Sequence, residues 1–201
     1  ALPKVAHQLA GLPIIEHVLR TAESLDGASI TVVVGHEANK IKALASEREK
    51  IQFVTQSPQL GTGHALLQAE SVLTNASGTV VLLYGDVPLL TANTLRRLVE
   101  HHLSERASAT VLTATVPDPY GYGRIVRDQA GRIARIVEER DASGDERLIN
   151  EINSGIYALA VGPLFDALKR LATDNAQGEY YLTDLIAAYR QRALTVELAL
   201  G

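Results

Sequence analysis

The stretch TVVLLYGDVP, residues 79–88, decides how the rest of the sequence is interpreted. Its first five residues are β-branched or aliphatic and uncharged, which is typical of a strand buried on both faces of a parallel sheet. That strand would end at Tyr84, after which a glycine, an aspartate and a proline turn the chain. Open α/β sheets bind ligands at the carboxyl ends of their strands, so Asp86 either holds a metal ion or only caps the turn.

Helical and strand patterns alternate along the first 116 residues. Thr62 and Thr91 stand where two of the helices would begin, and a threonine hydroxyl there can accept a hydrogen bond from a free backbone N–H. We expect helices over 12–25, 37–48, 62–73 and 91–103, and strands over 29–34, 51–55, 79–84 and 109–116. This alternation predicts an α/β, Rossmann-like fold with a mostly parallel sheet flanked by helices.

The pattern changes after residue 116. A β-hairpin is predicted where residues 125–127 and 133–137 flank a polar turn that contains a glycine. The remaining elements expected are strands over 153–159 and 194–200 and helices over 164–171 and 182–192. We interpret this half as a part that completes a pocket over the sheet, within a single domain of residues 1–201.

Composition narrows the class of protein. Apolar residues make up 46% and charged residues 21% of the 201 residues, an ordinary globular composition. The net charge is −4 and no basic stripe is visible, which argues against a nucleic-acid partner. The absence of cysteine excludes disulfides and thiolate metal sites and fits a reducing cytoplasm. No apolar run approaches the roughly 20 residues of a membrane span, so no membrane insertion is expected.

Four further stretches are candidates for chemistry, each with a plainer reading beside it. The glycines of residues 59–65 would let a nucleotide approach the backbone, or they form only a helix-capping loop. Residues 118–125 would line a sugar site, or form a tight turn with surface aromatics. Glu138 and Asn153 would hydrogen-bond sugar hydroxyls, or lie on the surface. Residues 175–184 form a polar loop before a helix, and no spacing of residues within this loop identifies a particular reaction.

Taken in order, these motifs resemble the uridylyltransferase domain of the bifunctional bacterial UDP-N-acetylglucosamine synthesis enzyme. The resemblance extends over nearly the whole chain, and the last motif is its most specific part. The matching segments are LPK (2–4), Gln56 with LGTGHA (60–65), YGDVPL (84–89), GYGRI (121–125), IVE (136–138), EINSGI (151–156) and NAQGEYYLTD (175–184).

The resemblance implies an Mg²⁺-dependent nucleotidyltransferase of the cytoplasm, acting in the synthesis of cell-wall peptidoglycan and lipopolysaccharide precursors. UTP and N-acetylglucosamine 1-phosphate would give UDP-N-acetylglucosamine and pyrophosphate. The sugar phosphate oxygen would attack the α-phosphorus of UTP, with no covalent enzyme intermediate. Catalysis would then rest on positioning and charge neutralisation.

The resemblance also implies roles for individual residues. Lys4 would contact phosphate and Asp86 would bind Mg²⁺, as the two catalytic residues. The nucleotide-binding part, about residues 1–116, would use side chains or backbone of Lys4, Gln56, Gly61, Thr62, Tyr84, Gly85 and Asp86, with Gln56, Gly61 and Thr62 reading uracil. The sugar-binding part, about residues 117–201, would use Gly123, Glu138 and Asn153, with Tyr181 and Thr183 nearby.

The sequence departs from the family at both ends. Family members have a buried central strand and a glycine-rich phosphate loop before the Leu-Pro-Lys, and a second metal-binding asparagine beyond the residue that matches Gly201. They continue into a left-handed β-helix acetyltransferase domain through which homotrimers form. We therefore expect a domain cut at both ends, with unpaired backbone groups on two sheet strands and weak or no catalysis.

Two alternatives remain open. The first is a nucleotidyltransferase for another base or sugar phosphate, which a competition between bases would separate from uridylyl transfer. The second is a catalytically inactive domain of the same kind that serves as a binding module. Retention of Lys4, Asp86, Glu138 and Asn153 argues against an inactive domain, because such a domain has no physical need for all four.

Overall fold

The computed structural model describes residues 2–45, 48, 51–73 and 76–200. Its helices are η1 (Lys4–Ala6, a 3₁₀ turn), α1 (Ile14–Glu23), α2 (Ala38–Leu44), α3 (Thr62–Gln68), α4 (Glu70–Leu73), α5 (Ala92–Ser104), α6 (Gly144–Arg147), α7 (Val161–Leu168) and α8 (Asp184–Gln191). Its strands are β1 (Gln8–Leu9), β2 (Leu12–Pro13), β3 (Ile30–Val34), β4 (Ile51–Thr55), β5 (Thr79–Leu82), β6 (Ala109–Thr115), β7 (Arg124–Arg127), β8 (Ile133–Val137), β9 (Glu151–Ala160) and β10 (Val196–Leu200).

The larger sheet has the order β10-β6-β9-β7-β8, with β5 also paired to β9. Strands β5 and β6 both run antiparallel to β9, and β10 runs parallel to β6, so β5, β6 and β10 share one direction. Strands β3 and β4 form a separate parallel pair. Most strands of this sheet (β5, β6, β7 and β10) run in one direction, as expected for a mostly parallel sheet, and β8 and β9 run the opposite way. Among the described residues, β3 pairs only with β4 and β5 only with β9, so each keeps one unpaired edge.

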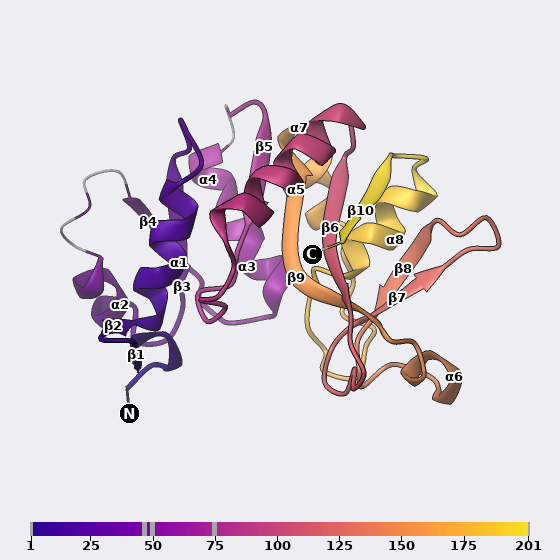
Figure 1. The fold of residues 1–201 in the computed structure, drawn as a ribbon, viewed down its shortest axis with the longest axis horizontal. Coiled ribbons are helices and arrows are strands. Elements are labelled where there is room, and N and C mark those ends of the chain that lie inside the picture. The colour runs from indigo at the N-terminus through magenta and orange to yellow at the C-terminus, as the bar shows by residue number, and fades with distance from the viewer. Residues whose placement is uncertain (1, 46–47, 49–50, 74–75, 201) are drawn as a thin grey trace.

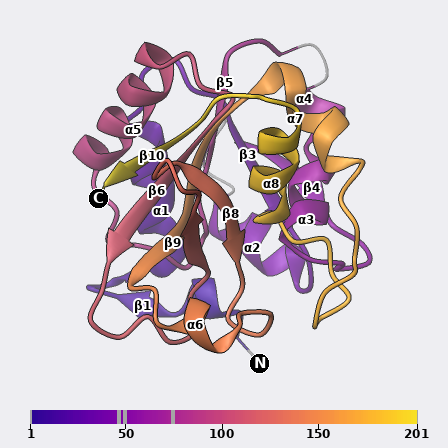
Figure 2. The same cartoon turned by 90° about the vertical axis from the view of Figure 1, so that its right-hand side faces the viewer.

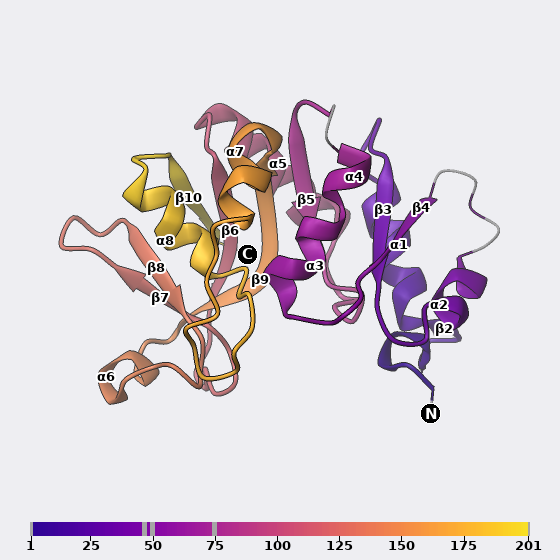
Figure 3. The same ribbon diagram turned by 180° about the vertical axis from the view of Figure 1, so that it is seen from behind.

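Helices cover both faces of the sheet. Figure 1 shows α1 and α5 in front of the strands, and Figure 3 shows α3, α7 and α8 on the opposite side. Viewed along the sheet, the strands lie between these two helical layers (Figure 2). The β7–β8 hairpin and α6 project from the end of the molecule opposite the N-terminus (Figure 1).

The alternation of side chains along β9 explains why its second half, residues 156–160, is a continuous apolar run. Ile156 and Ala158 pack against Leu95 and Leu98 of α5 on one face. The residues between and beyond them in the strand face the other way, into the main core with α7 and α8. A strand covered on both faces has no need for a polar face, because successive side chains point to opposite sides.

Several predicted elements differ from the structure in their bounds. The strand expected over 79–84 ends at Leu82, where its pairing with β9 ends, and its side chains are half-buried and not fully buried on both faces. The helix expected over 62–73 is divided into α3 and α4 at Ala69. The helix expected over 37–48 ends at Leu44, and residues 46–47 of that range lie outside the described residues.

Of the two predicted helix caps, one is confirmed and one is wrong. The Thr91 hydroxyl accepts a hydrogen bond from the Thr94 backbone at the start of α5. At α3 the N-cap residue is Gly61, and Thr62 is the first helical residue. The short elements η1, β1, β2 and α6 were not expected from the sequence. They contain too few residues to show a helical or strand period.

Candidate functional site

The register of three adjacent strands brings together the residues expected to bind the sugar. Arg124 of β7 pairs with Val137 of β8 on one side and with Ile152 of β9 on the other. The residues next in line, Gly123, Glu138 and Asn153, therefore form a row across the ends of these strands. The Asn153 backbone N–H donates to the Gly123 carbonyl at 2.8 Å. A Cβ at Gly123 would lie 3.5 Å from Asn153 Cβ and 3.5 Å from Glu138 Oε2.

Glu138 is the acidic group of this row. Its Oε1 accepts a hydrogen bond of 2.9 Å from the hydroxyl of Thr183, which is 4% exposed. Burial raises the pKa of the Glu138 carboxyl, and the nearby carboxylates of Asp184 and Asp141 raise it further. The Thr183 hydrogen bond acts in the opposite direction. A half-buried acceptor of this kind suits a hydroxyl or amide donor from a ligand.

Tyr84 and Gly155 fit closely beside this row. A Cβ at Gly155 would lie 2.6 Å from Cε2 of Tyr84, and the glycine has φ +81°, a conformation that other residues rarely adopt. The Gly155 backbone N–H donates to Asn153 Oδ1 at 3.0 Å, which orients the asparagine side chain. Burial raises the pKa of Tyr84 to about 12 in spite of its hydrogen bond with Thr62. Tyr84 therefore connects the row to the glycine loop that precedes α3.

The residues expected to read a base form a second group, which the 175–184 loop holds in place. Gln56 is 9% exposed, and its Nε2 donates to the Gly61 carbonyl at 3.0 Å. The Leu182 backbone N–H donates to the Thr62 hydroxyl at 3.1 Å. Gly61 has φ +104°, and a Cβ there would lie 2.8 Å from the Tyr180 carbonyl oxygen. The close approach of the two loops thus depends on this glycine.

The backbone of the glycine loop is partly engaged within the protein. The Gly63 N–H donates to the Tyr180 carbonyl at 2.8 Å, and the Tyr180 N–H donates to the Leu60 carbonyl at 2.9 Å. From the sequence, a nucleotide was expected to approach the backbone of this loop. The structure corrects this for Gly63, whose N–H is already bonded.

Lys4 and Asp86, far apart in the sequence, form an ion pair in the structure. The Lys4 ammonium lies 2.7 Å from Asp86 Oδ2, and this hydrogen bond raises the pKa of Lys4. Among the described residues no group of three or more His, Cys, Asp or Glu side chains forms a metal site. A single carboxylate that already attracts a cation still fits Mg²⁺, because that ion commonly takes one or two protein carboxylates and completes its shell with phosphate and water.

Two of the expected site residues, Tyr181 and Gly85, do not lie on an exposed surface. Tyr181 is 6% exposed, and burial raises the pKa of its hydroxyl. The nearby carboxylates of Asp141 and Glu138 also raise this pKa, which places the hydroxyl close to the turn that carries Glu138. At Gly85 a Cβ would lie 3.4 Å from Val5 Cγ1, so this glycine packs against the N-terminal segment.

Three residues of the site region had no assigned role in the sequence interpretation. His64 Nδ1 lies 3.0 Å from Gln56 Nε2, and its ring stacks on Tyr180 with centroids 6.2 Å apart. Arg124 and Glu139 form an ion pair of 2.6 Å. In the sequence, Arg124 is recognisable only as an arginine at the start of an apolar strand, and Glu139 only as a carboxylate that follows such a strand. Such patterns also occur on solvated surfaces.

The fold is that of solved sugar nucleotidyltransferases. A glucose-1-phosphate thymidylyltransferase from Bacillus anthracis has the same fold, with a TM-score of 0.81 and 23% identity over 98% of this chain and 78% of that chain. A UDP-glucose pyrophosphorylase solved with UDP-glucose gives a TM-score of 0.76 and 18% identity over 98% of this chain and 83% of that chain. The chain belongs to the MobA-like NTP transferase domain family, whose model matches residues 2–192.

Curated relatives confirm the resemblance inferred from the motifs. The bifunctional protein GlmU of Lactococcus lactis subsp. cremoris (strain SK11) is 46% identical over 98% of this chain. That of Streptococcus gordonii (strain Challis) is 46% identical over 94% of this chain. The chain spans only 42% and 41% of the lengths of these two relatives. In the part of the chain that the structure describes, no helix has the length and apolar character needed to cross a membrane.

Proposed function

We propose that this chain binds UTP and N-acetylglucosamine 1-phosphate and transfers the uridylyl group between them. The observation that carries the proposal is the row of Gly123, Glu138 and Asn153, which is joined through Tyr84 to the loop of Gly61 and Thr62. The GlmU relatives at 46% identity support the same reaction.

In this proposal the two groups of residues hold the two substrates side by side. Gln56 and the loop to which it is hydrogen-bonded lie against the uracil. Glu138 and Asn153 form hydrogen bonds with the sugar. Tyr84, at the junction, lies against the ribose. Positioning of this kind supplies much of the acceleration when no covalent intermediate is formed.

Charge neutralisation would come from Lys4 and Asp86. Mg²⁺, held by Asp86 together with phosphate oxygens, would stabilise the charge that develops on the departing pyrophosphate. In this structure the Lys4 ammonium forms an ion pair with Asp86, and it would move to a phosphate oxygen when substrate is bound. Mg²⁺ dependence, a cytoplasmic location and assembly into trimers remain predictions.

Thermal unfolding with ligands tests the proposal. The panel contains UDP-N-acetylglucosamine, UDP-glucose, GDP-mannose, UTP and GTP, each with Mg²⁺. A ligand that binds only the folded state adds about 2.7 kcal/mol of stability at a hundredfold excess over Kd. We expect the largest shift with UDP-N-acetylglucosamine. A larger shift with a guanine nucleotide would show that the site prefers guanine to uracil. The absence of a shift with every ligand would refute the proposal.

Matched variants locate the binding. Gln56→Ala should reduce the shift with every uridine nucleotide, and Asn153→Ala only the part that the sugar adds. The control variants are Gln52→Ala and Asn93→Ala, which truncate the same residue types at exposed positions of β4 and α5 and should leave every shift unchanged. Equal losses in the control variants would show that the effect is general destabilisation.

A further inference from the structure

An ion pair with a buried arginine lies next to the proposed sugar row. Arg124 is 2% exposed, which is rare for a residue that is always charged, and its Nη2 lies 2.6 Å from Glu139 Oε2. The pair is formed between the first residue of β7 and the second residue after β8. It therefore connects the two strands whose ends carry Gly123 and Glu138.

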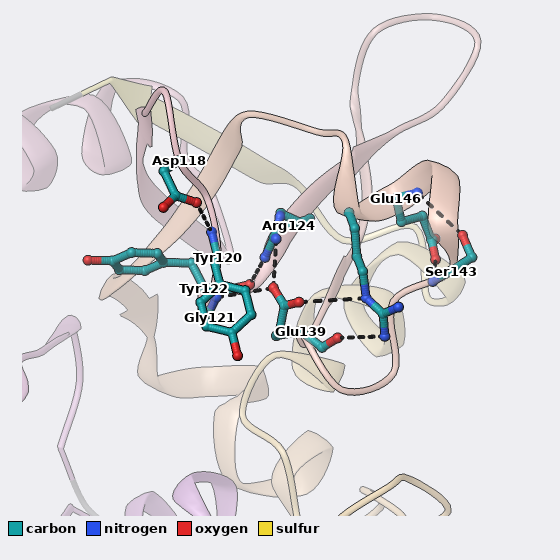
Figure 4. A network of polar contacts seen from close by, with 9 residues as sticks. Asp118, Tyr120, Gly121, Tyr122, Arg124, Glu139, Ser143 and Glu146 are labelled. Atoms are coloured by element: carbon teal, nitrogen blue, oxygen red, sulfur yellow. Dashed lines mark hydrogen bonds and ion pairs between the residues drawn. The ribbon is translucent and has the colours of Figure 1, made fainter.

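The pair also holds the loop before β7 at two points of its backbone. Arg124 Nη1 donates to the Tyr122 carbonyl, and the Gly121 N–H donates to Glu139 Oε2 at 3.1 Å. Figure 4 shows the Glu139 carboxylate linked by dashed lines to Arg124 and to the Gly121 backbone of this loop. Because both bonds fall within two residues of Gly123, the position of its peptide depends on them.

The carboxylate of this pair is ionised and restrained from a second side. The hydrogen bond from Arg124 lowers the pKa of Glu139, and the Gly121 N–H lowers it further. Arg147 Nε lies 3.6 Å from Glu139 Oε1. Neighbours in the same turn hold the other loop of the site: Glu138 accepts from Thr183, and Asp141 accepts from the Ala176 N–H at 2.8 Å. The turn at 138–141 thus ties together the two loops that border the site.

We infer that Arg124 and Glu139 are positioning residues that set the sugar selectivity of the site. They act by fixing the Gly121–Gly123 backbone and the start of the Glu138 turn, and they need not touch the sugar. The inference rests on the proposed function. It adds a specific expectation, that damage to the pair weakens recognition of the sugar and leaves recognition of the uridine nucleotide intact.

The test compares two ligands by titration calorimetry, UDP-N-acetylglucosamine and UTP, on the complete chain with Mg²⁺. Arg124→Lys keeps the charge, but one ammonium cannot replace a planar fork that reaches both a carbonyl and a carboxylate. Glu139→Gln keeps the shape and weakens the pair, and it provides a second variant if the lysine variant does not fold. The control variants are Arg127→Lys and Glu151→Gln, which change the same residue types in an ion pair of 2.8 Å at the other end of β7.

We expect Arg124→Lys and Glu139→Gln to weaken UDP-N-acetylglucosamine binding by about tenfold, a loss comparable to about one hydrogen bond to a charged group. UTP binding should change by less than about threefold, and neither control variant should separate the two ligands. If the parent chain binds neither ligand, the proposed function fails and this inference with it. If the parent binds both, and Arg124→Lys weakens both equally or behaves as Arg127→Lys does, the inference alone is overturned.

Discussion

Gly155→Ala tests whether the close fit of Tyr84 and Gly155 holds the site together. A methyl group there would lie 2.6 Å from Tyr84 Cε2 and 2.9 Å from Cδ2, so the ring would have to move. The positive φ of +81° adds a backbone cost for any residue with a Cβ. The backbone contributes about 1–2 kcal/mol and the overpacking about 1–3 kcal/mol, which together lower the free energy of unfolding by about 2–5 kcal/mol.

The control variant is Gly131→Ala in the β7–β8 turn. Gly131 has φ +76° and nothing within 4 Å of its Cβ position, so it carries the backbone cost alone. The assay is urea unfolding of both variants, followed by circular dichroism. We expect Gly155→Ala to be the more destabilising of the two by about 1–3 kcal/mol.

A double-mutant cycle isolates the contact with the ring. In a Tyr84→Ala background the steric conflict is gone, so Gly155→Ala should cost only its backbone share. The coupling between the two positions should then be about 1–3 kcal/mol. Equal costs for Gly155→Ala in both backgrounds, or equal costs for Gly155→Ala and Gly131→Ala, would refute this reasoning.

Three further predictions follow from single contacts. Thr91→Ala should lower the free energy of unfolding by about 1 kcal/mol through loss of the α5 cap, and an unchanged urea midpoint would contradict this. Burial lowers the pKa of His102, and His101 lowers it further. The contribution of neutral His102 to the free energy of unfolding should therefore be complete above its pKa in the unfolded chain, about 6.5, and be lost as the pH drops toward its pKa in the folded protein. His102→Gln should flatten this part of the urea midpoint–pH curve, and an unchanged slope would count against it. Asp86→Asn should remove most of the difference between UTP binding with and without Mg²⁺ in calorimetry, and a full Mg²⁺ effect in the variant would exclude Asp86 as a ligand.

The sequence predicted well those features that depend on neighbours along the chain. The strand over 51–55 and the Thr91 cap agree with the structure, because alternation and capping are local patterns. The end of β5 was placed two residues too late, because its length depends on pairing with β9, 75 or more residues away along the chain. Thr62 fits a cap by type, yet its hydroxyl is used by Leu182 from a distant loop.

The candidate site was predicted through resemblance, while its geometry depends on long-range register. Nothing local shows that Arg124 pairs with both Val137 and Ile152, and this pairing is what aligns Gly123, Glu138 and Asn153. From the sequence alone Glu138 could have lain on the surface, and it stands in the charged run Glu138-Glu139-Arg140-Asp141. The three carboxylates of this run receive hydrogen bonds from two distant segments, Glu138 and Asp141 from the 175–184 loop and Glu139 from Arg124, which no spacing rule within the run could reveal.

The separation of β3–β4 from the larger sheet has a consequence for the cooperativity of unfolding. Ile15, Leu19, Val34, Ile41 and Ala45 form a core of their own around β3, α1 and α2, distinct from the two cores that cover β9. No strand ladder joins this small core to the others among the described residues. Regions with separate cores and exposed backbone edges open at different free energies. Amide hydrogen exchange should therefore show that the region around β3 and β4 opens at a lower free energy than the region around β9.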